Sequence, residues 1–183
     1  VTGGLRCGSP RCGWEIVSLE QFPDAPEVVE DGVTAAANAI KKALAIARHT
    51  NLVTLADDTA LEVDALGGAP GVCSSRYAGP GATYADNVRK LLRDLTGIPL
   101  EQRTARFRCV IAVAEGERVK TVEGVCAGLI TLAPRGDGGF GYDPVFLVPA
   151  MRRTFAEMSS EQKHRVSHRG EALRKAREVL AGW

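Results

Sequence analysis

Two adjacent aspartates, Asp57 and Asp58, interrupt the mostly apolar stretch LADDTALEVDALGGAPG, which begins at Leu55. Neighbouring carboxylates repel each other, and burying them is costly unless a cation or a hydrogen-bond donor offsets the charge. One of them can hold a hard divalent ion, and the other can accept a proton from the water that this ion polarises. Aspartate is also common in plain turns that follow strands, so both interpretations stay open at this point.

Charged residues also lie just before and within a predicted helix that precedes the aspartates. Glu30 can supply a second carboxylate to a magnesium ion, which takes one or two from a protein and completes its shell with water and phosphate oxygens. Of Lys41 and Lys42, one can face phosphate and the other solvent. Each of these charges also fits a solvated surface position.

The segment GGFGYDP, residues 138–144, has three glycines that let its backbone approach a ligand closely. Phe140 and Tyr142 offer aromatic faces on which a base can stack, and Asp143 can accept hydrogen bonds from ring N–H groups. A tight turn whose aromatic side chains enter the core accounts for the same segment.

The basic segment KHRVSHRG, residues 163–170, lies at the predicted start of the last helix. His168 and Arg169 can donate hydrogen bonds there, beside backbone amides that also favour acceptors. A 6-keto purine presents the acceptors O6 and N7, whereas adenine presents an amino donor that would leave buried donors unsatisfied. A basic helix start without a ligand is the alternative.

The elements that must position these groups alternate between helix and strand. Helices are expected from Thr34 to about His49, after Thr83, and from Ser167. Strands are expected at 15–19, 52–56, 61–65 and 145–148, and a long hairpin at 104–114 and 119–132. The residues expected to face inward are Ile40, Ala43, Leu44, Ala47, Tyr84, Val88, Leu91, Leu92, Leu95, Phe107, Cys109, Ile111, Val113, Leu173, Ala176, Val179 and Leu180. Together these patterns predict an α/β fold with a mixed sheet.

Length and composition indicate an ordinary soluble globular domain, with 183 residues, 45% of them hydrophobic and 25% charged. The net charge of +1 argues against a general nucleic-acid or anionic-membrane partner, and the longest apolar runs are too short to cross a bilayer. The start lacks both a signal peptide and a methionine, so we expect a trimmed chain. An odd, scattered set of cysteines predicts free thiols in a reducing cytoplasm: Cys7, Cys12, Cys73, Cys109 and Cys126.

Four blocks together resemble the inosine triphosphate pyrophosphatase family, whose members hydrolyse non-standard purine nucleoside triphosphates (ITP, dITP and XTP). They are EVVEDGVT with NAIKKA, LADDTALEVDALGGAPGVCSSRYAG, PRGDGGFGYDPVFLVP and MSSEQKHRVSHRGEAL, in the family's order from about Trp14 onward. The resemblance implies one domain over 1–183, with an elongated mixed β-sheet flanked by helices and two lobes around a cleft. It further implies a cytoplasmic homodimer that uses Mg²⁺ to release pyrophosphate and a monophosphate.

The resemblance also implies roles for particular residues. Asp58 is similar to the family's catalytic base, and Asp57, Asp58 and Glu30 are similar to its magnesium ligands. Lys42 resembles the lysine that reaches the triphosphate, and Thr59 a small hydroxyl residue beside the site. The residues similar to the base-stacking and base-reading set are Phe140, Gly141, Tyr142, Asp143, Lys163, His168 and Arg169.

The N-terminus departs from the family pattern, which opens with a strand, the motif Thr-Gly-Asn-x-x-Lys and a long helix. Here Gly4 replaces the Asn and Cys7 the Lys, so residues 1–13 form an atypical or truncated segment. Ala37 also replaces a family Glu. We therefore expect a weakened triphosphate grip and a sheet that lacks an edge. Three hypotheses follow: an active magnesium-dependent pyrophosphatase, a catalytically impaired nucleotide-binding member, or a phosphoanhydride hydrolase with shifted substrate choice.

Overall fold

The structure is a computed structural model that describes residues 2–7 and 14–183. Its strands are β1 Thr2–Cys7, β2 Trp14–Ser18, β3 Val53–Val63, β4 Pro70–Gly71, β5 Thr104–Glu115, β6 Arg118–Ile130, β7 Phe146–Val148 and β8 Arg153–Thr154. Its helices are α1 Ala35–Thr50, α2 Tyr84–Asp94, α3 Ser160–Val166 and α4 His168–Ala181, and short 3₁₀ turns join several of these elements. The predicted α/β class is confirmed.

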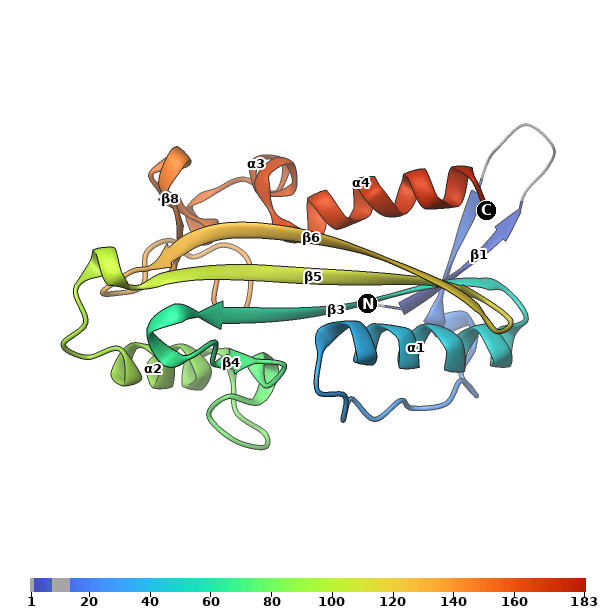
Figure 1. Ribbon diagram of the computed structural model, residues 1–183, viewed down its shortest axis with the longest axis horizontal. Coiled ribbons are helices and arrows are strands. Elements are labelled where there is room, and N and C mark those ends of the chain that lie inside the picture. Colours follow the sequence, from blue (N-terminus) through green and yellow to red (C-terminus); the bar gives the residue numbers. More distant parts are fainter. Residues whose placement is uncertain (1, 8–13) are drawn as a thin grey trace. The chain divides into compact units, whose positions relative to one another are not determined.

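The strands form one sheet in the order β2-β1-β3-β5-β6-β7-β8, and β4 pairs with β3 outside this path (Figure 1). β1 is antiparallel to both β2 and β3, with Leu5 opposite Ile16 on one side and Val53 on the other. The expectation that the sheet lacks an edge is therefore wrong, because residues 2–7 pair with β3 and β2 follows beyond them. Gly4 and Cys7 lie in β1, but the side chain of Cys7 and the cysteine at position 12 lie outside what the structure describes.

A single strand, β3, replaces the two short strands expected at 52–56 and 61–65. The sequence predicted that the first of these strands ends at the two aspartates. Side-chain partners on both faces make the break unnecessary, because adjacent strand residues point to opposite faces and meet different neighbours. Asp57 and Asp58 therefore lie within a continuous strand and not at its end.

Cα packing divides the chain into two compact units. Unit 1 comprises the chain up to Asp58 together with Cys109–Glu123 and Ala172–Trp183, and unit 2 comprises Thr59–Arg108 and Gly124–Glu171. Strands β3, β5 and β6 and helix α4 each contribute residues to both units.

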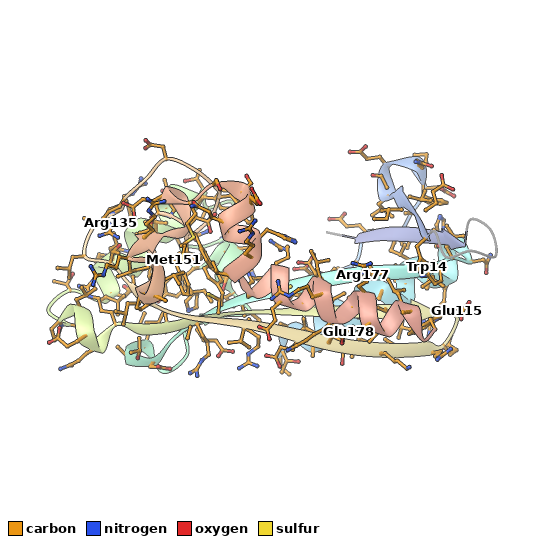
Figure 2. The ribbon with its side chains drawn as sticks, turned by 90° about the horizontal axis from the view of Figure 1, so that it is seen from above. Trp14, Glu115, Arg135, Met151, Arg177 and Glu178 are labelled. Carbon is orange, nitrogen blue, oxygen red and sulfur yellow. The ribbon has the colours of Figure 1, made fainter. Side chains whose placement is uncertain are left out.

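Within unit 1, α1 and the C-terminal part of α4 lie on opposite sides of the strands (Figure 1). Cys109 and Ile111 of β5 pack against Ala172 and Ala176 of α4. Because helices cover both faces, the intervening β5 residues are buried as well, which hides the alternation typical of a half-exposed strand. Figure 2 looks onto the outer side of α4, where Arg177 and Glu178 are exposed.

Within unit 2, an aromatic cluster forms the centre of the core. The ring of Phe107 lies 4.7 Å from that of Phe146 and 4.5 Å from that of His168, measured between centroids. Phe155 packs against Phe146 at 4.9 Å. Leu61, Val63, Leu91 and Leu95 surround these rings. The core therefore fixes the start of α4, because His168 is its first residue.

The capping signals in the sequence correctly predicted the starts of α1, α2 and α4, whereas α3, capped by Ser159, was not predicted. The Thr34 hydroxyl accepts a hydrogen bond from Ala37 N at 3.1 Å, and Thr83 forms a reciprocal capping box with Asp86. Two expected inward-facing residues are exposed, however: Leu173 by 39% and Tyr84 by 58%. Helical spacing places Tyr84 on the apolar face of α2, but as the first residue of the helix it extends past the core.

The hairpin of β5 and β6 agrees with the prediction. It turns through Gly116 and Glu117, and Gly116 has φ +57°, a conformation that favours glycine at the first position of a tight hairpin turn. Among the described residues, no helix is both long and apolar enough to cross a membrane. Cys73, Cys109 and Cys126 are free thiols, as expected for these three positions.

Candidate functional site

Lys42 is the centre of a charged cluster in unit 1. Its Nζ donates to Glu30 Oε1 at 2.6 Å and to Asp58 Oδ1 at 3.3 Å. Lys41, one residue earlier, instead pairs with the exposed Asp31 at 2.7 Å. Lys42 therefore points into the acidic cluster and Lys41 toward an exposed partner, and the contact of either lysine with phosphate stays a prediction.

Asn38 holds this cluster in place, although sequence reasoning did not single it out. The side chain is buried on the first turn of α1. Its Oδ1 accepts from Gly32 N at 2.7 Å, and its Nδ2 donates to Asp58 Oδ2 at 3.5 Å. A Cβ on Gly32 would lie 2.5 Å from Asn38 Oδ1, so only glycine allows this close approach. The NAIKKA motif thus contains one site-positioning residue four positions before Lys42.

Burial and the neighbouring charges shift the pKa values in this cluster. Burial raises the pKa of Asp58 above its ordinary value; the charge of Lys42 counteracts this shift, and the charge of Glu30 adds to it. Burial opposes the charge on Lys42, but the hydrogen bond to Glu30 and the charges of Asp58 and Glu30 outweigh it and raise the pKa of Lys42. Lys42 is therefore a permanent cation at neutral pH, and Asp58 is a comparatively basic carboxylate.

Asp57 has a different neighbour, because it points to the other face of β3. It is buried, and its Oδ2 lies 3.7 Å from the Cys109 Sγ of β5. In the part of the chain that the structure describes, no three His, Cys, Asp or Glu side chains form a set that would hold a metal ion. The structure thus brings two of the three predicted metal ligands, Glu30 and Asp58, to one cation.

These two carboxylates fit a magnesium ion by their chemistry. Magnesium needs only one or two protein carboxylates when phosphate and water provide its other ligands. Glu30 and Asp58 already converge on a cation, the Lys42 ammonium, so their oxygens are arranged for positive charge. The cluster has one net negative charge, which a bound divalent ion would reverse.

A cavity of about 160 Å³ lies within unit 2. This volume suits a single heterocycle more than a drug-sized molecule. It collects all the predicted base-site residues and Thr59, namely Thr59, Phe140, Gly141, Tyr142, Asp143, Lys163, His168 and Arg169. Four further lining residues were not predicted as site residues: Ser74, Ser75, Tyr84 and Phe107. The serines belong to the block VCSSRYAG, and the two aromatics were assigned to the core.

The loop that carries Phe140 is fixed by Asp143. The buried Oδ2 of Asp143 accepts from Phe140 N at 2.8 Å and from Lys163 Nζ at 2.5 Å. Gly139 has φ +73°, and a Cβ there would clash with the same oxygen. Phe140 is 53% exposed, whereas Tyr142 is buried and donates to Ser74 O at 2.9 Å. Phe140 thus presents its ring at the cavity, whereas Tyr142 packs into the core.

Arg169 and Lys163 supply the cavity's fixed positive charge. Arg169 Nη2 lies 3.4 Å from Thr59 Oγ1. Its Cζ is 5.9 Å from the centroid of Phe140, and Lys163 Nζ is 4.7 Å from the same point. Gly170 lets α4 start against the end of α3, because a Cβ there would overlap the His164 carbonyl. An aromatic face and two cationic donors therefore share one small pocket, and Thr59, on its wall, follows Asp58 in the chain.

Comparison with known proteins gives consistent matches over most of the chain. The sequence model of the Ham1 family matches residues 7–179. A dITP/XTP pyrophosphatase of Desulforamulus reducens is 56% identical over 170 residues, which is 92% of this chain and 85% of the relative. One from Geobacillus kaustophilus is 54% identical and covers 89% of this chain and 80% of the relative. The structure of a HAM1 protein from Coxiella burnetii superposes with a TM-score of 0.85 at 44% identity, covering 91% of this chain and 86% of that one.

Proposed function

Since this chain belongs to the Ham1 family, we propose that it hydrolyses non-standard purine nucleoside triphosphates, dITP, ITP and XTP, to a monophosphate and pyrophosphate. The observation that carries this proposal is the unit 2 cavity. There Phe140, Lys163 and Arg169 combine an aromatic face with two donors that have no acceptor capacity. The names of the relatives in Desulforamulus reducens and Geobacillus kaustophilus support the same substrate class.

Base selection follows from which polar atoms the pocket satisfies. The 6-keto purines offer O6 and N7 to Arg169 and Lys163, and their N1–H can donate to Asp143. Adenine offers an amino group where the pocket needs an acceptor, and its N1 has no proton to donate. A lost hydrogen bond to a charged donor costs about 1 to 3 kcal/mol, which corresponds to selection of roughly 5- to 150-fold per lost contact.

The cluster of Lys42, Glu30 and Asp58 is assigned to the triphosphate and the attacking water. With one net negative charge, this cluster would repel a triphosphate, so we propose that it works with Mg²⁺ bound to Glu30 and Asp58. Asp57, the third ligand predicted from the sequence, lies on the other face of β3 and is not included in this pair. When bound, Mg²⁺ would supply positive charge for the phosphates and acidify water. Asp58 then takes the proton of the attacking water, and Lys42 stabilises charge that develops on the phosphates.

Two further features of the proposal concern assembly and location. We propose a homodimer, as the family resemblance implies, and its mass in solution by sedimentation would test this. We also propose the cytoplasm, because free thiols at Cys73, Cys109 and Cys126 suit a reducing compartment.

The test is release of pyrophosphate from dITP, XTP and ATP, with magnesium and with EDTA. The proposal predicts rapid turnover of dITP and XTP, slow turnover of ATP and no turnover in EDTA. Binding of dITP without turnover would favour the impaired nucleotide-binding member. Equal or faster turnover of ATP would indicate a phosphoanhydride hydrolase with another substrate.

A further inference from the structure

Two exposed aromatic rings lie next to each other on the wall of the unit 2 cavity. Tyr84 is 58% exposed and Phe140 is 53% exposed, and both line the same cavity. Their ring centroids are 6.2 Å apart, with planes inclined by 44°. A single exposed aromatic residue is ordinary on a protein surface. Two neighbouring exposed rings on the wall of a pocket that also contains Lys163 and Arg169 are better explained by a flat ligand.

The start of α2 holds Tyr84 at the cavity wall. Thr83 N donates to Asp86 Oδ2 at 2.9 Å, which closes the first turn of the helix. Asn87 is buried, and its Nδ2 donates to Ser75 O at 3.0 Å while its Oδ1 accepts from Ala78 N at 2.7 Å. Ser75 also lines the cavity. Asn87, three residues after Tyr84, thus ties the start of α2 to the segment that contributes Ser75 to the cavity.

The separation of the two rings is close to what a stacked base requires. Carbon atoms of stacked rings lie about 3.5 Å apart, so a base between two aromatic faces separates them by about 7 Å. The observed 6.2 Å, between rings inclined by 44°, is the direct contact of a tilted aromatic pair, so a base enters between them only after one ring turns. A small rotation of either ring opens the gap, and rotation is inexpensive for side chains that are more than half exposed.

We propose that Tyr84 is a second base-stacking residue, which covers the face of the purine opposite Phe140. The inference rests on the proposed function, because it requires a purine nucleotide in this cavity, and it adds a residue that determines affinity for the base. Phe140 supplies one face, Tyr84 supplies the other, and Lys163 and Arg169 read the edge. A bicyclic purine overlaps both rings more fully than a pyrimidine does, so Tyr84 also favours purines.

The test measures binding of inosine 5′-monophosphate and of tripolyphosphate by calorimetry. Tyr84→Ala is expected to weaken binding of the monophosphate about fivefold to a hundredfold, the range for loss of one stacked aromatic face. Tyr84→Phe keeps the ring and is expected to bind within about twofold of wild type. Tripolyphosphate has no base, so its binding is expected to be equal in all variants. Arg93→Ala is the matched control, because Arg93 is exposed on the same helix but does not line this cavity.

Two results would overturn the inference, and they can be told apart. If Tyr84→Ala binds inosine monophosphate like wild type while Phe140→Ala does not, Tyr84 has no stacking role and the proposed function stands. If wild-type protein neither binds inosine monophosphate nor hydrolyses dITP, the proposed function fails and the inference fails with it. Circular dichroism of each variant tests for misfolding. Substitutions at these positions are expected to leave the fold intact, because both side chains are more than half exposed.

Discussion

Replacing Gly139 with alanine is expected to disable the base cavity through one carboxylate. Gly139 has φ +73°, a left-handed conformation that strains any residue with a Cβ. The new Cβ would also clash with Asp143 Oδ2. That oxygen accepts from Phe140 N at 2.8 Å and from Lys163 Nζ at 2.5 Å, so Asp143 cannot move aside without losing both donors.

The expected cost can be divided into two parts. Alanine in the left-handed conformation costs about 1 kcal/mol of unfolding free energy. Loss of a hydrogen bond to a buried charged group costs about 1.5 to 3 kcal/mol more. Gly139→Ala should therefore destabilise the protein by roughly 2.5 to 4 kcal/mol. Gly141 is a matched control: it has φ +61°, but its Cβ would meet nothing within 4 Å, so Gly141→Ala should show only the first cost.

Urea denaturation of the three proteins measures these free energies, and initial rates with dITP measure the effect on KM. Gly139→Ala is expected to lose at least twice the free energy that Gly141→Ala loses. Its KM for dITP should rise at least tenfold under conditions in which it is still folded, because Phe140 and Lys163 both lose their fixed positions. Equal destabilisation by the two substitutions would refute the argument from the Asp143 clash.

The remaining predictions concern charged groups. The hydrogen bond from Lys90, at 2.6 Å, lowers the pKa of Asp94 in the folded protein. This pair should therefore stabilise the fold at every pH above the pKa of an unfolded aspartate, about 3.9. The stabilisation should be lost as the pH falls through the lower pKa that Asp94 has in the folded protein. Thermal unfolding at pH 7 and below pH 3 should show an Asp94→Asn penalty at the first pH only. Lys42→Gln removes the charge that opposes the raised pKa of Asp58, so the acid limb of kcat/KM should move to higher pH; an unmoved limb would exclude their coupling. Arg169→Ala should weaken binding of ITP more than it slows residual ATP hydrolysis, and equal losses would remove its role in base selection.

Local signals in the sequence predicted local structure well. Thr34 and Thr83 begin helices because a hydroxyl can accept from the free amides of the first turn, an effect that depends on a few neighbouring residues. The hairpin of β5 and β6 was predicted from its alternation and its Gly116 turn in the same way. The segments 138–144 and 163–170 concentrate glycine, aromatic and basic residues, and the structure places their predicted base-site residues around one cavity. Their role in binding a base stays a prediction.

Features that depend on distant neighbours were not predictable from these patterns. Continuity of β3 through Asp57 and Asp58 depends on Cys109, Lys42 and Asn38, which lie far away in the sequence. The paired strand at residues 2–7 was missed for the same reason. Tyr84 fits the helical periodicity of α2, and only the position of the helix end relative to the core shows that its ring lies in the cavity.

The central claim is that Asp58 activates water for hydrolysis of a keto-purine triphosphate. The most direct test is pyrophosphate release from dITP by wild-type protein and by Asp58→Asn, each with magnesium and each checked for binding of inosine monophosphate. The account predicts that Asp58→Asn binds the monophosphate like wild type but loses kcat by at least about a hundredfold, the usual range for removing a general base. A variant that retains more than a tenth of the wild-type kcat would contradict it.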